Sequence, residues 1–144
     1  MSPWTALLES LHSALIDELT ERHPEPKPEL GLPSRHSSFT LPKESPPEIL
    51  FCEVDQEPGG KGTVLLALDL GCSKTLKLSA EELWKAILKR AGSEFMRRQI
   101  KPKLGRVTLA AAGPALPAGY NEPQRLVWIP FRLPAGRIYL GMGV

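Results

Sequence analysis

Apolar side chains recur along this chain with two different periods, which divide it into helical and extended segments. Between residues 78 and 106 they recur at steps of three and four, as on one face of a helix, at Ala80, Trp84, Ile87, Leu88, Ala91 and Phe95. Ser79 is a suitable N-cap for this helix. Gly92 and Ser93 interrupt the pattern, which leaves open a broken helix whose second, shorter part runs through Ile100.

The same helical period governs residues 3–22. Ser2 and Pro3 fit the N-cap and the first helical position. The apolar stripe consists of Trp4, Leu7, Leu8, Leu11, Leu15, Ile16 and Leu19. We interpret this segment as an amphipathic helix packed on a sheet, with a partner-binding or dimerising helix as the alternative.

Alternation of apolar and polar side chains marks the extended segments. Residues 48–55 and 62–70 lie on either side of a glycine-rich turn, which predicts a β-hairpin. Because 62–70 is apolar on both faces, we expect it to be a central strand. Residues 106–112 form a third predicted strand, and 125–132 and 136–143 form a terminal hairpin.

The terminal hairpin leaves its register open by one residue. Either Trp128 or Ile129 can face the helices, because a shift of one position exchanges the two faces of a strand. Pro130 has no backbone N–H to donate, so it predicts a strand at an edge or one that carries a bulge.

Residues 23–47 differ from the rest of the chain in composition, since they hold seven of the fifteen prolines. Alternating prolines favour extended backbone over helix, so we expect a linker or an arm that lies on the domain, mobile in part. The whole chain of 144 residues predicts a single α+β domain. Its sheet has about five strands, antiparallel or mixed, and two or three helices cover one face. Residues 1–22 form an N-terminal helix of the domain, 23–47 the arm or linker, and 48–144 the core.

Composition excludes several classes of protein. The hydrophobic fraction is 42%, and no apolar run approaches the roughly 20 residues of a membrane-spanning helix. The N-terminus lacks the pattern of a secretory signal, so we expect a cytoplasmic protein. Cys52 and Cys72 do not form a disulfide framework, and we expect both thiols to be reduced. The three histidines show no ligand spacing, and the sequence predicts neither a metal site nor another cofactor.

Positive charge is concentrated in one segment. Residues 81–106 hold eight basic and three acidic side chains, whereas residues 1–80 have a net charge of −5. From residue 89 onward its basic side chains are Lys89, Arg90, Arg97, Arg98, Lys101, Lys103 and Arg106. A solvated helix face, an acidic protein partner and a nucleic acid are the three interpretations, and nucleic acid is the least favoured because only Phe95 supplies an aromatic ring. The candidate binding residues are Lys89, Arg90, Glu94, Arg97, Arg98 and Lys101.

The order of elements resembles that of the CheC/CheX-type chemotaxis phosphatases and the related middle domain of the flagellar motor-switch protein. The segments that carry the resemblance are TALLESLHSALIDEL, PGGKGTVLLALDL, AEELWKAILKRA, AAAGPALPAGY and LVWIPFRLPAGRIYLGMGV. They extend over most of residues 1–22 and 48–144. The resemblance implies an α+β fold and a partner among chemotaxis or motor proteins.

Active members of that family carry a Glu and an Asn three residues apart on a helix, where the pair orients water against an aspartyl phosphate. This sequence has no such pair, and Glu94 is followed three residues later by Arg97. The resemblance therefore implies no catalytic residue here. We expect a non-catalytic interaction domain that recognises an acidic partner, such as a response regulator or a motor component, through its basic helix. A phosphatase with an atypical site near Glu94, weak nucleic-acid binding through residues 89–106 and a homodimer are the alternatives.

Overall fold

The helices and strands of the computed structural model, which describes residues 2–144, follow one another along the whole chain. Their order is α1 (Pro3–Arg22), β1 (Glu29–Leu30), β2 (Ser34–His36), β3 (Glu48–Gln56), β4 (Gly60–Leu68), α2 (Leu70–Leu76), α3 (Ala80–Arg97), β5 (Lys103–Ala111), β6 (Leu126–Leu133) and β7 (Gly136–Gly143).

Helix α1 forms where the apolar period predicts it. The Ser2 hydroxyl accepts a hydrogen bond from the backbone N–H of Thr5 at 3.1 Å, and so caps a helix end whose N–H groups otherwise lack partners. One face of α1 is fully buried in the core, through Leu7, Leu11, Leu15 and Leu19. The predicted amphipathic helix is confirmed, and it packs on the sheet.

Helix α3 is continuous, so the break left open at Gly92 and Ser93 does not occur. The helix starts with a capping box, in which Ser79 and Glu82 each accept a backbone N–H of the other. It ends where Gln99 adopts a positive φ of 57°. There the N–H of Ile100 bonds to the carbonyl of Phe95 at 3.0 Å, a Schellman-type ending that leaves no second helix.

The strands form one antiparallel sheet in the order β1-β6-β7-β4-β3-β5, with β2 also pairing with β6. Strand β4 lies between β3 and β7, which confirms its predicted central position. The α+β class is confirmed, but the sheet has seven strands where about five were expected. The additional strands β1 and β2 come from the proline-rich segment and pair along the outer side of β6.

The register of β6 places Ile129 toward the helices and Trp128 on the opposite face. Ile129 belongs to the core that contains α1 and α3, whereas Trp128 packs in a second core. Pro130 lies between the positions that β1 and β2 cover, and its carbonyl accepts the N–H of Gly31 at 3.0 Å. In a strand the N–H and C=O of one residue point to the same side. The N–H that proline lacks would therefore point toward the interval between β1 and β2, where no strand needs it as a donor.

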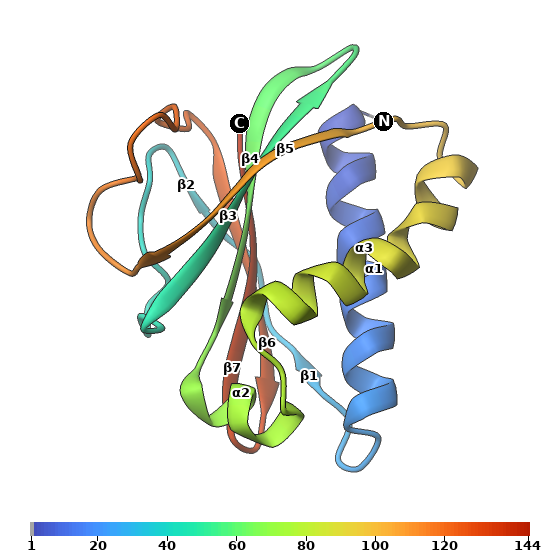
Figure 1. Ribbon diagram of the computed structural model, residues 1–144, viewed down its shortest axis with the longest axis vertical. Coiled ribbons are helices and arrows are strands. Elements are labelled where there is room, and N and C mark those ends of the chain that lie inside the picture. Colours follow the sequence, from blue (N-terminus) through green and yellow to red (C-terminus); the bar gives the residue numbers. More distant parts are fainter. Residues whose placement is uncertain (1) are drawn as a thin grey trace.

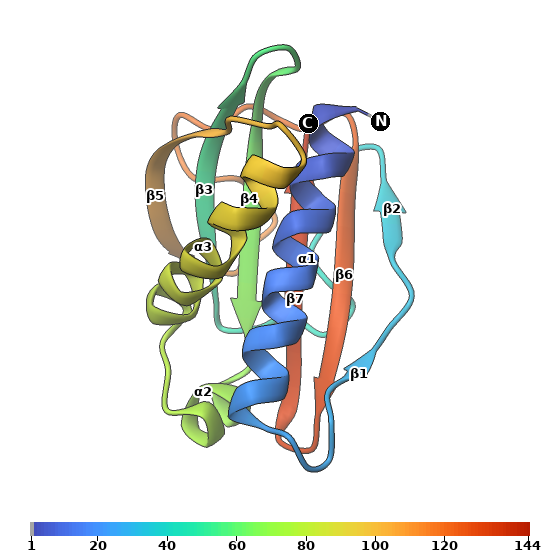
Figure 2. The ribbon, with the colours of Figure 1, turned by 90° about the vertical axis from the view of Figure 1, so that its right-hand side faces the viewer.

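Both faces of the sheet are covered, each by a different part of the chain. Figure 1 shows α1 and α3 packed against one face, and Figure 2 shows α1 in front of β6 and β7 with α3 in front of β3 and β4. On the other face, Trp128 and Tyr139 pack with residues of the arm and of the β5–β6 loop, namely Phe39, Leu41, Leu116 and Tyr120. None of the helices within residues 2–144 is long and apolar enough to cross a bilayer.

Helix α2 occupies a place where the alternation predicts the end of a strand. Strand β4 ends at Leu68, and the backbone of Asp69 donates to the carbonyl of Arg137 at 3.0 Å. The Asp69 carboxylate accepts the N–H of Arg137 at 2.8 Å. These two bonds turn the chain, so Leu70 begins a helix and is 62% exposed instead of extending the apolar face of the strand.

Cys52 and Cys72 are both buried, and they are not joined by a disulfide. Burial raises the pKa of Cys52 and of Cys72 to about 11, with a smaller contribution from the neighbouring carboxylates Glu53 and Asp69. The thiolate is the reactive form of cysteine, so neither thiol is activated.

Candidate functional site

Ion pairs join α1 to α3 and use part of the predicted basic surface. The buried Glu18 carboxylate of α1 accepts two hydrogen bonds. One comes from Nε of Arg22 at 2.8 Å, and the other comes from Nε of Arg90 in α3. Arg90 reaches the Glu21 carboxylate with its second nitrogen. Charge-assisted bonds of this kind are stronger than neutral ones, so Arg90 is held against α1.

A second group of ion pairs lies toward the C-terminal end of α3. Arg98 donates to Glu9 of α1 at 2.6 Å and to Glu94 at 3.3 Å, and Arg97 donates to Glu94 at 2.6 Å. The hydrogen bond from Arg97, together with that from Arg98, lowers the pKa of Glu94. A carboxylate held in this way is a weak base, which counts against a catalytic role for it.

The outer face of α3 carries lysines that take no part in these ion pairs. Lys85 and Lys89 lie one turn apart and are exposed, and within residues 2–144 neither forms a salt bridge. Gly92 and Met96 continue the same face at helical spacing. Met96 is 81% exposed, and a methyl group at Gly92 would meet nothing in residues 2–144 within 4 Å except the backbone of its own helix. We call Lys85, Lys89, Gly92 and Met96 the outer face of α3.

The structure thus divides the six predicted binding residues. Arg90, Glu94 and Arg98 bond with one another or with α1, and the exposed Arg97 is paired with Glu94. Lys89 lies on the outer face, and Lys101 is exposed just beyond the helix. Sequence reasoning missed Lys85 and Met96. The signal for Met96 was present, because it is an apolar residue out of phase with the buried stripe.

Replacement of Glu18 by Gln tests the ion pairs. We expect Glu18→Gln to lower the free energy of unfolding by about 1–2 kcal/mol at pH 7, because two partly exposed arginines lose their shared carboxylate. Burial raises the pKa of Glu18, but hydrogen bonds and charges from Arg90 and Arg22 outweigh burial, and the net shift is downward from 4.5. This contribution is therefore present above about pH 4.5 and is lost as the pH falls through the pKa of the folded state.

Urea denaturation of both proteins between pH 7 and pH 3 measures this difference. Glu21→Gln is the matched control, since Glu21 also bonds Arg90 but its side chain is 69% exposed, and we expect a change within about 0.5 kcal/mol. A Glu18→Gln difference that stays constant down to pH 3 would contradict the assignment.

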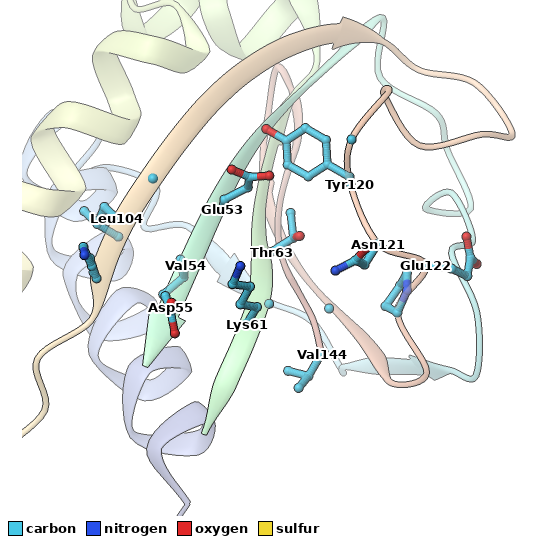
Figure 3. A pocket seen from close by; sticks show the side chains of 16 residues that line it. Glu53, Val54, Asp55, Lys61, Thr63, Leu104, Tyr120, Asn121, Glu122 and Val144 are labelled. Atoms are coloured by element: carbon cyan, nitrogen blue, oxygen red, sulfur yellow. The ribbon is translucent and has the colours of Figure 1, made fainter. Parts of the chain in front are cut away.

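A cleft of about 300 Å³ opens on the other face of the sheet, away from α1 and α3. It lies between the open ends of β3, β4 and β5 and the loop before β6, and Figure 3 shows charged and polar side chains around it. The only asparagine of the sequence, Asn121, lines this cleft and so lies on the opposite side of the sheet from Glu94. Within residues 2–144 no group of three or more His, Cys, Asp and Glu side chains is placed to hold a metal ion.

Comparison with solved structures identifies the fold. A chemotactic CheC-like protein from Shewanella oneidensis superposes with a TM-score of 0.69 at 10% identity, over 96% of this chain and 97% of that one. CheX from Borrelia burgdorferi, in a complex with CheY, BeF3 and Mg, gives a TM-score of 0.56 at 13% identity over 94% and 96%. The FliM middle domain from H. pylori gives 0.57 at 13% identity over 97% and 87%.

The sequence comparisons find no counterpart to these structures. No protein-family model matches the sequence, and no curated protein matches it either. At identities of 10–13%, the structural similarity establishes a shared fold but does not establish a shared function. The resemblance to CheC/CheX-type proteins and to the motor-switch middle domain is therefore confirmed at the level of the fold: this chain has the fold of CheC-like, CheX and FliM middle-domain proteins.

Proposed function

We propose that this protein is a non-catalytic interaction domain of chemotaxis or flagellar signalling, and that it recognises an acidic protein partner through the outer face of α3. The observation that carries the proposal is the division of charge on α3. Arg90 and Arg98 are bound to α1, while Lys85 and Lys89, which form no salt bridge within residues 2–144, lie on the same face of α3 as the exposed Met96. An exposed apolar side chain next to charged ones is a common feature of protein interfaces.

The comparisons suggest the kind of partner. CheX of Borrelia burgdorferi has been solved with CheY, BeF3 and Mg, so a protein of the same fold binds a response regulator. We extend this to the present chain and propose a response-regulator receiver domain, with a location in the cytoplasm. Lys101 lies four residues beyond the end of α3, and we include it in the proposed surface together with Lys89 and Arg97.

The phosphatase alternative has less support. It requires a side-chain pair that orients water, and Glu94 is held by two arginines while Asn121 lies across the sheet. We therefore expect the domain to bind a phosphorylated receiver domain without accelerating the loss of its phosphoryl group. An increased rate of phosphate release would overturn the non-catalytic part of the proposal.

Charge reversal on α3 tests the binding surface. We expect Lys85→Glu combined with Lys89→Glu to weaken binding of a receiver domain at least about tenfold, because like charges then face the partner. The probe is the CheY of the Borrelia complex with Mg²⁺ and BeF3, followed by other acidic receiver domains, titrated by calorimetry at about 50 mM and about 300 mM salt.

Lys27→Glu combined with Lys43→Glu provides the control, since both lysines are exposed in the arm and the net charge changes by the same amount. This control variant is expected to bind like the wild type. If no receiver domain binds, or if the α3 variant binds as tightly as the control, the proposed surface is wrong.

A further inference from the structure

The cleft on the face opposite α3 is built from strands whose register brings charged side chains together. Asp55 of β3 lies opposite Lys61 of β4 and opposite Lys103 of β5. Directly opposed residues share a face of the sheet, so these three side chains form one row. Val54 packs in the helix-side core, so its neighbours Glu53 and Asp55 point to the cleft side.

The loop before β6 is held in place over the cleft by its own contacts. Arg106 donates to Glu53 and to the carbonyl of Ala118, each at 3.2 Å, and its guanidinium lies 4.6 Å from the centre of the Tyr120 ring. The Tyr120 hydroxyl lies 2.9 Å from the Thr108 hydroxyl. The wall of the cleft is thus fixed without a ligand.

The Glu122 carboxylate, at the edge of the cleft, also helps to hold the loop in place. Glu122 accepts the backbone N–H of Phe39 at 2.6 Å, and Figure 3 shows its carboxylate directed away from the cleft. The loop is therefore tied to the arm as well as to the sheet.

Other polar groups around the cleft bond to nothing in the part of the chain that the structure describes. Within residues 2–144 the side chains of Asp55, Lys61, Thr63, Lys103 and Asn121 make no hydrogen bond or salt bridge, although they line one cavity of about 300 Å³. Figure 3 shows Lys61, Thr63 and Asn121 directed toward the same space from β4 and from the loop. A formed cavity with a few converging polar groups is the usual character of a small-molecule site, and this volume lies at the lower end of such sites.

We propose that this cleft binds a small zwitterion of the α-amino-acid class. The ammonium groups of Lys61 and Lys103, with the donors of Thr63 and Asn121, provide the partners that a carboxylate needs. Asp55, between the two lysines in the row, provides the partner for an ammonium group. A ligand that carries one charge of each sign contacts both, whereas a ligand with only one charge contacts either the lysines or Asp55 and leaves the other without a ligand group. The site is independent of the α3 surface, because it lies across the sheet from it.

The test is an NMR titration of the ¹⁵N-labelled full chain with L-serine and L-alanine. Acetate and ethylamine, each up to about 10 mM, serve as ligands that carry only one of the two charged groups. We expect the amino acids to shift the amides of residues 53–63, 103–105 and 119–123 and to leave those of α3 unchanged. We also expect them to bind at least about tenfold more tightly than either acetate or ethylamine.

Two variants assign the charged ends of the ligand. Lys61→Met should weaken amino-acid binding about tenfold and leave ethylamine binding unchanged, and Asp55→Asn should weaken it likewise and leave acetate binding unchanged. Lys43→Met, outside the cleft, is the control and should bind like the wild type. Absence of shifts with either amino acid, equal affinity for acetate, or undiminished binding by Lys61→Met would overturn the proposal.

Discussion

Trp128→Ala is expected to lower the free energy of unfolding by about 3–5 kcal/mol, the largest single effect that we predict. Trp128 is 1% exposed and is the largest fully buried side chain on the arm-covered face of the sheet. Its ring meets Tyr139 edge-on at 6.3 Å and lies over Gly141, where an added Cβ would be 2.7 Å from the ring. Removal of the ring leaves a void that neighbouring strands cannot fill without moving.

The same variant should loosen the arm more than the helices. The indole N–H of Trp128 donates to the carbonyl of Thr40 at 2.7 Å, which fixes the arm to the sheet. We therefore expect amide hydrogen exchange to speed up in residues 37–47 before it changes in α3. Trp128→Phe, which keeps most of the ring and loses the hydrogen bond, should cost about 1–2 kcal/mol. A loss below 1 kcal/mol for Trp128→Ala in urea denaturation would show that the packing between the arm and the sheet contributes little to stability.

The periodic segments of the fold could be predicted from the sequence, but the coverage of the second sheet face could not. The register of β6 was ambiguous because Trp128 and Ile129 are both buried, one under the arm and the other under α1. A strand that is buried on both faces loses the alternation that reveals its register. The long-range packing of Ile129 with the helices and of Trp128 with the arm resolves it, and no local pattern indicates those contacts.

The candidate site shows a similar limit. The basic run of α3 could be predicted from composition, but the use of each charge depends on partners that are remote in sequence. Arg90 meets Glu18, which is 72 residues away, and Arg98 meets Glu9, which is 89 residues away. The row of Asp55, Lys61 and Lys103 likewise follows from strand register, which a scan for sequence motifs does not detect.

Gly71→Ala is expected to lower the free energy of unfolding by about 2–3 kcal/mol, although alanine has a higher helix propensity than glycine. Gly71 lies at the start of α2, where the helix meets the turn between β6 and β7. A Cβ there would lie 2.1 Å from the carbonyl oxygen of Ala135, which belongs to the backbone and cannot rotate away. Either α2 or the turn must therefore shift, and the bonds between Asp69 and Arg137 that hold them together are strained.

Gly92→Ala makes the same chemical change in α3 and should have the opposite effect. Apart from the backbone of its own helix, no atom of residues 2–144 lies within 4 Å of the added methyl group, and the helix is continuous through this position. Glycine in a helix interior costs about 0.5–1 kcal/mol relative to alanine, so we expect Gly92→Ala to stabilise the protein by about that amount. Denaturation curves of the two variants, measured together, separate close packing from helix propensity. If both substitutions stabilise, the contact between α2 and the Ala135 turn is looser than described, and if both destabilise, Gly92 contacts something beyond its own helix.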